Sequence, residues 1–427
     1  MAETLTPQEK IALINQNLQE VLKPQIIEDV IVKQNRPLVL YWGTATTGRP
    51  HCGYFVAMVK LAHFLRAGCR VKILLADIHG FLDNLKAPIE LVNFRAEYYR
   101  FVILGLLKAV NVPVDRLEFI LGSSYQLSAK YTMDLFRLSS VVTEHDAKKA
   151  GAEVVKQVDN AFLSGLIYPL MQALDEEHLG VDAQFGGVDQ RKIFALAQEV
   201  LPKVGYKERA HLMNPMVPGL AGGKMSASDP DSKIDLLDTP DVVKKKLRKA
   251  YAVPKEVEGN GIISFVEYVL LPVSALKGGK PEFVVDRRED EGGPLTYSDI
   301  ETLKADYTAD KLTPQLLKAA TTTALVSVLE PIQTAFQASQ EWQDIERKAY
   351  PPPPSADEKK KKKKPKDRGS RYPGAAAGAT TTTAAEKGVQ ALPDGSVEGK
   401  DAAQVSVGAG VDEAMRKLEV EAPKTVQ

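Results

Sequence analysis

The apolar pattern near the start of the chain predicts a strand, a helix and a second strand in succession. Residues 38–42 form a short apolar run that is typical of a buried strand. After a loop containing glycine, threonine and proline, apolar residues recur at spacings of three and four, which predicts a helix ending near Leu65. Residues 70–77 then indicate a second buried strand. This order predicts a right-handed parallel crossover with a ligand at the carboxyl ends of the strands.

Similar patterns predict structure along most of the chain. We expect helices over residues 6–22, 88–110, 131–141, 163–177, 193–200 and 262–271, with a further helix starting at 313–314. We expect a strand over residues 117–121, an extended segment over 211–217, and a small hairpin over 282–286 and 293–297. The combination predicts an α/β core followed by a mainly helical region.

The composition changes after Tyr350. A proline run at residues 351–354, a lysine run at residues 359–364 and a stretch rich in alanine and threonine follow one another. Such segments bury too little apolar surface to offset the entropy lost on ordering. We therefore expect residues 351–427 to form a disordered tail.

Bulk composition narrows the class of protein. The chain has 427 residues, 44% of them hydrophobic, which is enough for two or three domains with real cores. Its formal net charge is zero, so any surface that binds nucleic acid must be local. Two cysteines argue against a disulfide scaffold and a structural zinc site. No apolar run reaches bilayer length and no leader peptide is evident, so we expect a cytosolic enzyme without a membrane partner.

Two loops carry candidate phosphate chemistry. His51 stands at the entrance of the first predicted helix, where unpaired backbone N–H groups and the helix dipole favour an anion. The second loop, residues 222–228 (GGKMSAS), is hinged by glycines and carries Lys224 and two hydroxyls. A histidine and a lysine at these places could donate hydrogen bonds to phosphate oxygens.

The two loops and their surroundings resemble the signature motifs of class I aminoacyl-tRNA synthetases. The segments YWGTATTGRPH, YPLMQALDE, AQFGGVDQRKIF and NPMVPGLAGGKMSAS are similar to those of tyrosyl-tRNA synthetases of the eukaryotic and archaeal type. The resemblance is close over residues 38–237 and looser up to residue 350. It implies a Rossmann-like catalytic domain at 1–235 with a dimerising insertion at about 120–160, and a helical anticodon-binding domain at 236–350.

The resemblance also implies the reaction and the partners. ATP with Mg²⁺ would activate L-tyrosine to tyrosyl-adenylate, and tRNA(Tyr) would then accept the tyrosine, with no tightly bound cofactor. A homodimer in the cytoplasm is implied, and a basic run over residues 244–249 adds a minor nuclear pool as a further expectation. No carboxylate cluster in the sequence identifies magnesium ligands, and no resident metal site is expected.

The resemblance assigns the ATP site residue by residue. His51 and Lys224 are the expected catalytic residues because both can donate to phosphate oxygens. The full expected ATP set is Thr44, Thr47, Gly48, His51, Tyr54, Lys224, Met225, Ser226 and Ser228. Tyr54 and Ala227 depart from the family pattern, which has a second histidine and a second lysine at these positions. These departures put the detailed phosphate contacts in question.

The expected tyrosine site consists of Tyr41, Asp77, Tyr168, Gln172, Asp175 and Gln190. Tyr168, Gln172 and Asp175 are spaced i, i+4, i+7, which places them on one face of a helix. We assign Tyr41 and Asp175 to the substrate hydroxyl, and Tyr168, Gln172 and Gln190 to its ammonium end. For Asp77 we weigh a contact with the substrate amino group and a structural role equally.

The expected tRNA contacts lie in the second part of the chain and consist of Lys244, Lys245, Lys246, Arg248, Lys249 and Tyr307. The basic cluster suits phosphates, although a solvated helix face is the simpler interpretation. Tyr307 suits stacking on an anticodon base, and a buried core tyrosine is an equal alternative. The rival functions are a tryptophanyl-tRNA synthetase, a catalytically silent RNA-binding scaffold and a small-molecule nucleotidyltransferase.

Overall fold

The computed structural model describes residues 5–83, 89–110, 112, 114–155, 162–220 and 233–351. The chain divides into two compact units, Met1–Pro354 and Ser355–Gln427, and every described residue belongs to the first. The predicted division at residues 235 and 236 therefore falls inside one compact unit and stays a prediction. The predicted disorder of the tail concerns residues outside the described ones.

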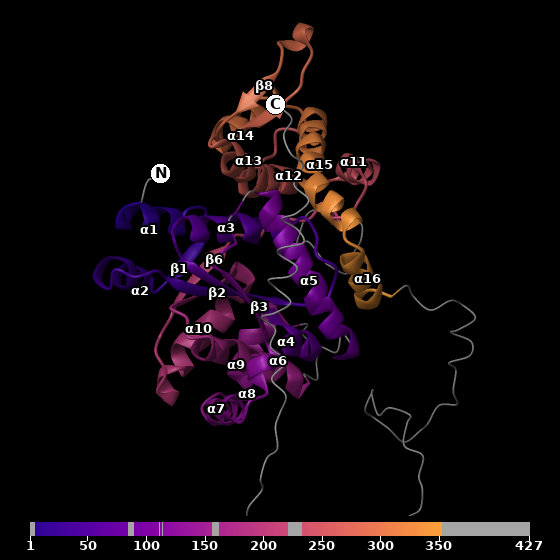
Figure 1. The fold of residues 1–427 in the computed structure, drawn as a ribbon. Helices are drawn as coiled ribbons and strands as arrows, with labels where there is room; N and C mark the ends of the chain where they lie inside the picture. The colour runs from indigo at the N-terminus through magenta and orange to yellow at the C-terminus, as the bar shows by residue number, and fades with distance from the viewer. Residues whose placement is uncertain are drawn as a thin grey trace, which may run out of the picture. The chain divides into compact units, whose positions relative to one another are not determined.

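A six-stranded sheet forms the centre of the first unit (Figure 1). Its strand order is β1-β6-β5-β2-β3-β4, where β1 is Glu20–Leu22, β2 Val39–Ala45, β3 Arg70–Ala76, β4 Leu117–Leu121, β5 Ala183–Gly187 and β6 Ala210–Asn214. All neighbouring pairs are parallel except β1 with β6. The predicted α/β class with a parallel sheet is confirmed.

Helices cover both faces of this sheet. The helices of this part of the unit are α1 Pro7–Asn15, α2 Pro24–Glu28, α3 Tyr54–Arg66, α4 Asp77–Leu82, α5 Ile89–Ala109, α6 Ser123–Gln126, α7 Ala129–Ser139, α8 Glu144–Ala150, α9 Leu163–His178 and α10 Arg191–Val200. Figure 1 shows α3 on one side of the sheet and α9 and α10 on the other.

The register of the strands decides which side chains meet which helix. Trp42 and Phe185 are neighbours on one face of the sheet, where Phe185 packs on α3. Tyr41 and Gln184 are neighbours on the other face, where the Tyr41 hydroxyl donates to the Gln172 carbonyl of α9. Side chains alternate between faces along a strand, so residues of even and odd number in β5 have opposite surroundings.

The second part of the first unit is mainly helical, as predicted. Its helices are α11 Pro240–Lys249, α12 Gly261–Phe265, α13 Leu271–Gly278, α14 Ile300–Thr308, α15 Pro314–Ala338 and α16 Gln340–Ala349. The predicted hairpin is present as β7 Phe283–Val285 and β8 Leu295–Tyr297. Trp342 of α16 stacks on Phe101 of α5, with ring centroids 5.6 Å apart, and this contact joins the helical part to the core.

Two predictions about long elements were wrong. The helix predicted over residues 6–22 ends at Asn15, because residues 20–22 instead pair with β6 as an edge strand. The segment Gly261–Gly278 is long and apolar enough to cross a bilayer, contrary to the expectation that no run reaches that length. Half of its residues are buried inside the protein, which is typical of a core helix.

Candidate active site

A cavity of about 300 Å³ lies between the sheet and α9. Seven of the predicted site residues line it, namely Tyr41, Thr44, Tyr54, Tyr168, Gln172, Asp175 and Gln190. The terminal residues of β2 and β3, Ala45 and Ala76, also line it. The cavity therefore opens at the carboxyl ends of the parallel strands, where the crossover predicts a ligand.

Asp175 is a fully buried carboxylate that lines this cavity. Its Oδ1 accepts hydrogen bonds from the Tyr125 hydroxyl at 2.7 Å, the Gln126 amide at 2.9 Å and the Tyr131 hydroxyl at 2.9 Å. Its Oδ2 has no hydrogen-bond partner among the described residues and lies 3.8 Å from His79 Nε2. Burial raises the pKa of Asp175 to about 7, against the three hydrogen bonds that lower it. Such an oxygen can accept a hydrogen bond from a ligand.

Tyr41 stands beside Asp175 with its ring inside the protein. Its hydroxyl donates to the Gln172 carbonyl at 3.2 Å. Burial and the nearby charge of Asp175 both raise the pKa of Tyr41, so the phenol stays protonated at neutral pH. Because a hydroxyl has one proton, Tyr41 can offer only its lone pairs to a ligand while this hydrogen bond persists.

The polar side chains expected at the ammonium end of the substrate contact one another or His79. The Gln172 amide nitrogen donates to Gln190 Oε1 at 2.8 Å. The Tyr168 ring meets the His79 ring edge-on, with centroids 4.6 Å apart. Burial raises the pKa of Tyr168, and the charge of Asp83, which also lines the cavity, raises it further. The cavity thus has a carboxylate at this end that the sequence patterns did not indicate.

Several further lining or supporting residues were missed. Tyr125, Gln126 and Tyr131 hold Asp175 but come from α6 and α7, a region that the resemblance assigned only to subunit packing. Gln184 lines the cavity from β5, a strand that the apolar pattern did not predict. His79 from α4 also lines the cavity. Each of these residues reaches the cavity or Asp175 from a helix or strand other than α9. The periodicity of one segment does not reveal contacts between segments.

Asp77 does not line the cavity. It is the first residue of α4, is 1% exposed, and its Oδ1 accepts from the Ser123 backbone N–H at 2.8 Å. This hydrogen bond fixes the end of β4 against α4. Of the two interpretations left open for Asp77, the structure favours the structural one.

His51 stands at the N-terminal end of α3, outside the lining of the cavity but next to it. Its ring meets the Tyr54 ring edge-on, with centroids 5.7 Å apart, and Tyr54 lines the cavity. Burial and the positive charge of Lys233 lower the pKa of His51 to about 4. The Gly53 backbone N–H donates to Nδ1 at 3.2 Å, so the single proton of the neutral ring is at Nε2. His51 is a neutral hydrogen-bond donor.

The loop before His51 is held through its carbonyl groups. The Thr47 carbonyl accepts from Arg95 at 2.6 Å, and the Gly48 carbonyl accepts from the Tyr99 hydroxyl at 2.6 Å and the Tyr350 hydroxyl at 2.8 Å. These contacts come from α5 and from the residue that follows α16. They leave the backbone N–H of Gly48 outside this network.

Thr44 and Tyr54 bind each other. The Thr44 and Tyr54 hydroxyls are 3.0 Å apart, and Tyr54 also donates to the Tyr99 hydroxyl at 3.4 Å. Tyr54, which replaces a family histidine, is therefore tied to the loop network. Lys224, Met225, Ser226 and Ser228 lie outside the described residues, as does Ala227.

Comparison with known proteins identifies the family. The family model "tRNA synthetases class I (W and Y)" matches residues 33–330. A Saccharomyces cerevisiae protein, "Tyrosine--tRNA ligase, cytoplasmic", is 60% identical over 353 residues, covering 82% of this chain and 90% of the yeast protein. The Xenopus tropicalis protein of the same name is 56% identical over 351 residues, covering 82% of this chain and 65% of the frog protein.

Solved structures agree with these relatives. A tyrosyl-tRNA synthetase from Archaeoglobus fulgidus in complex with L-tyrosine has a TM-score of 0.71 and 36% identity, covering 77% of this chain and 99% of that chain. A tryptophanyl-tRNA synthetase from Aeropyrum pernix, at 18% identity and a TM-score of 0.57, shares the fold alone. The chain belongs to the class I tyrosyl-tRNA synthetases. The family predicted from the motifs is confirmed, and the tryptophanyl alternative is not favoured.

The predicted contact of this synthetase with an anticodon base through Tyr307 was wrong. Tyr307 is fully buried, and its hydroxyl donates to the Val253 carbonyl at 2.8 Å. A ring enclosed in this way cannot stack on a base. The alternative of a core tyrosine is the correct one.

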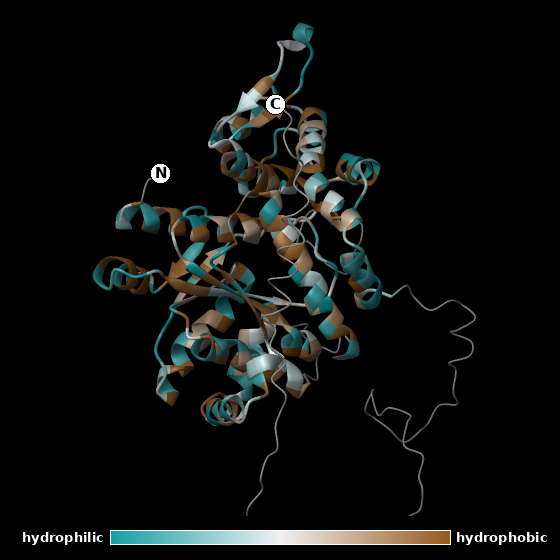
Figure 2. Ribbon diagram, viewed as in Figure 1, coloured by the Kyte–Doolittle hydropathy of each residue, from teal (hydrophilic) through white to brown (hydrophobic). Residues whose placement is uncertain are grey.

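The predicted basic cluster lies on α11, which carries Lys244, Lys245, Lys246, Arg248 and Lys249. Four of the five are exposed, whereas Lys246 is partly buried and pairs with Asp238 at 2.6 Å. Val243 and Leu247 of the helix are buried, Val242 is 36% exposed, and Figure 2 shows α11 largely in the hydrophilic colour. Lys246 is thus a structural cation within a cluster that is otherwise open to a ligand.

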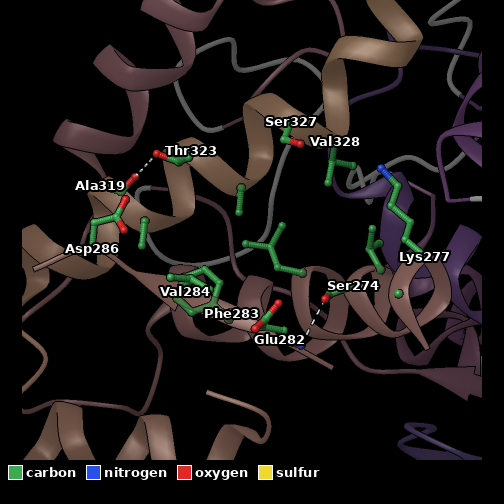
Figure 3. Close-up of a pocket in the computed structure, with 15 residues that line it drawn as sticks. Ser274, Lys277, Glu282, Phe283, Val284, Asp286, Ala319, Thr323, Ser327 and Val328 are labelled. Atoms are coloured by element: carbon green, nitrogen blue, oxygen red, sulfur yellow. Dashed lines mark hydrogen bonds between the residues drawn. The ribbon is translucent and has the colours of Figure 1, made fainter. Parts of the chain in front are cut away.

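A second and larger cavity, of about 550 Å³, lies between α13, β7 and α15 (Figure 3). Its lining residues include Ala320 and Ala324 of α15. The Glu282 backbone N–H donates to Ser274 Oγ, and both of these residues line the cavity. None of the described residues assigned to tyrosine, ATP or tRNA lines this cavity. Size alone therefore does not mark the active site of this synthetase.

Proposed function

We propose that this tyrosine–tRNA ligase carries out both of its steps at the cavity under α9. In the first step the carboxylate of L-tyrosine attacks the α-phosphorus of ATP, which releases pyrophosphate. In the second, a ribose hydroxyl of the terminal adenosine of tRNA(Tyr) attacks the activated carbonyl. Neither step needs a covalent bond to the protein, so the side chains align the reactants and offset charge. The yeast and frog relatives are both named cytoplasmic, in agreement with the predicted location.

The observation that carries the proposal is a buried carboxylate oxygen that has no hydrogen-bond partner in the part of the chain that the structure describes. Asp175 Oδ2 would accept the hydroxyl of the bound tyrosine, with Tyr41 beside it. Gln172, Gln190 and Asp83 would then surround the ammonium group, and Asp83 would supply the opposite charge that an ammonium ion requires. A phenylalanine in this position would leave Asp175 without a partner, and this cost is the physical basis of selection.

The phosphate end would lie at the loop around His51. The neutral His51 ring would donate its Nε2–H to a phosphate oxygen, and Lys224 would contribute a positive charge. Mg²⁺ would enter with ATP and offset the charge on its phosphates. Among the described residues, no group of three His, Cys, Asp or Glu side chains is placed to hold a metal ion. The protein would therefore bind Mg²⁺ as part of the MgATP complex.

Binding of tRNA and of a second subunit completes the proposal. The exposed cations of α11 would contact tRNA phosphates. Leu127, Met133 and Phe136, on or beside α7, are 70%, 53% and 62% exposed, which supports a homodimer formed through this insertion. A minor nuclear pool would depend on the same basic cluster of α11.

Charging of tRNA tests the proposal directly. The purified chain, incubated with MgATP, labelled L-tyrosine and tRNA, should produce acid-precipitable label. Omission of ATP or of tRNA should abolish the signal. A folded protein that binds tRNA but never charges it would instead indicate the silent RNA-binding scaffold.

A further inference from the structure

Gln184 occupies the floor of the tyrosine cavity on β5. Its Cα partner on β2 is Tyr41 and its Cα partner on β6 is His211, so the three side chains project from the same face of the sheet. Tyr41 reaches the Gln172 carbonyl of α9, and His211 reaches Glu176 Oε1 of the same helix at 2.7 Å. Gln184 stands between these two connections and lines the cavity.

The side-chain amide of Gln184 has no hydrogen-bond partner within the described parts of the chain. The residue is 1% exposed, and its Oε1 is buried without a partner. Buried amides are nearly always hydrogen-bonded, because an unpaired one gives up its hydrogen bonds to water and receives nothing in return. A ligand in the cavity that Gln184 lines would supply the missing partner.

The hydroxyl of bound tyrosine needs one more donor than the other residues provide. It would donate its proton to Asp175 Oδ2, and its own lone pairs would then need an N–H or O–H group. The proton of Tyr41 is already given to the Gln172 carbonyl. His79, another lining side chain with unpaired polar atoms, has its Nε2 3.8 Å from Asp175 Oδ2, and that carboxylate is its natural partner.

We propose that Gln184 is a specificity-determining residue that donates its side-chain amide N–H to the phenol oxygen of bound tyrosine. The amide can present either end, since its nitrogen and oxygen exchange places by rotation about the last side-chain bond. The inference rests on the proposed function and adds a residue to it. Phenylalanine would leave both Asp175 and Gln184 unpaired, so the two residues share the selection.

The test compares tyrosine with phenylalanine in ATP–pyrophosphate exchange for Gln184→Met, a replacement of similar size without an N–H. We expect kcat/KM for tyrosine to fall roughly ten- to hundred-fold and kcat/KM for phenylalanine to change by less than about two-fold. The ratio of kcat/KM for tyrosine to kcat/KM for phenylalanine isolates the contribution of the hydrogen bond. The comparison is a double-mutant cycle in which one change is the substitution of Gln184 and the other is removal of the substrate hydroxyl. Gln184→Asn, whose amide is shorter, should show the same loss and serves if the methionine variant does not fold.

Gln333→Met is the matched control. Gln333 donates its amide to the Leu236 and Asp238 carbonyls outside the cavity, so its replacement should lower the thermal midpoint without changing the substrate ratio. An unchanged ratio in both Gln184 variants would overturn the inference, as would equal losses for tyrosine and phenylalanine. Absence of tyrosine-dependent exchange in the unaltered protein would instead refute the proposed function itself.

Discussion

At the scale of single residues, Asp175 combines burial with the role of a hydrogen-bond acceptor. Its carboxylate is enclosed and receives three donors on one oxygen, while the other oxygen has no hydrogen-bond partner among the described residues. Burial is the larger influence, since its pKa is raised to about 7 in spite of these donors. The folded protein therefore stores a desolvated carboxylate where the substrate hydroxyl would bind, which is a cost to stability that serves selection.

This raised pKa predicts how stability depends on pH. Between about pH 4, the ordinary pKa of an aspartate, and about pH 7, the folded state holds a proton on Asp175 that the unfolded state has lost. Stability from this group is thus complete below pH 4 and is lost as pH rises through 7. In urea unfolding, the difference in stability between the unaltered protein and Asp175→Asn should shift in favour of the variant from pH 5 to pH 8. A difference that is constant with pH would contradict the assigned pKa.

The sequence predicted much of the candidate site at this scale, but not its partners. Tyr168, Gln172 and Asp175 lie on one helix, where their spacing placed them on one face, and the resemblance of the surrounding motif assigned them to a site. Gln184 and Asp83 were not predicted, because the contacts of Gln184 depend on strand register and Asp83 lies just beyond α4. The periodicity of a segment cannot predict a site residue whose position depends on how a neighbouring strand or helix is placed.

At the scale of elements, the apolar pattern predicted some short elements as well as long ones. The strand at residues 117–121, the hairpin and the helix beginning at Pro314 are present as expected. The strand β5 was missed because its sequence AQFGG offers one bulky apolar residue and two glycines, which weaken the strand pattern. The helix α16 was also missed, although Trp342 anchors it to α5.

The exposed face of α11 leads to a prediction about tRNA. Replacing Lys244, Lys245, Arg248 and Lys249 together by glutamine should weaken tRNA binding. The salt dependence of binding should also become shallower, by roughly one unit of slope for each phosphate that the protein no longer neutralises. Pyrophosphate exchange with tyrosine should be unchanged, because none of the four lines the cavity. Filter binding at several salt concentrations measures both the affinity and the slope.

Lys33→Gln provides the control for that experiment. Lys33 is exposed and its ion pair is with Asp29 one turn away, so it is a surface charge without a proposed tRNA contact. Its replacement should leave the salt slope as it is. If the α11 variant had the same slope as the unaltered protein, the simpler interpretation of a solvated helix face would stand.

At the scale of the whole molecule, the end of the helical region is joined to the loop around His51. The Tyr350 hydroxyl donates to the Gly48 carbonyl, and the Ala349 carbonyl accepts from Arg95 at 3.1 Å. Arg49 of the same loop pairs with Glu346 of α16 at 2.5 Å. A truncation of the chain must therefore keep Tyr350 if the loop around His51 is to stay in place.

These hydrogen bonds and this ion pair define a deletion that tests the tail. Removal of residues 352–427 should leave pyrophosphate exchange unchanged, because the residues that hold the loop remain. Charging at limiting tRNA should weaken, mainly at lower salt, because the lysine run at residues 359–364 would no longer attract phosphate and that attraction is screened at higher salt. Charging assays at low and high salt measure the effect. If the full chain and the truncated chain charged tRNA equally at every salt concentration, the tail would not contribute to tRNA binding.

The central claim is that the cavity under α9 selects L-tyrosine for activation by ATP. ATP–pyrophosphate exchange on the purified protein, with tyrosine, phenylalanine and tryptophan supplied separately, tests it most directly. The account predicts exchange with tyrosine alone, because only tyrosine pairs the buried oxygen of Asp175. Equal exchange with phenylalanine, or exchange with tryptophan in place of tyrosine, would contradict it.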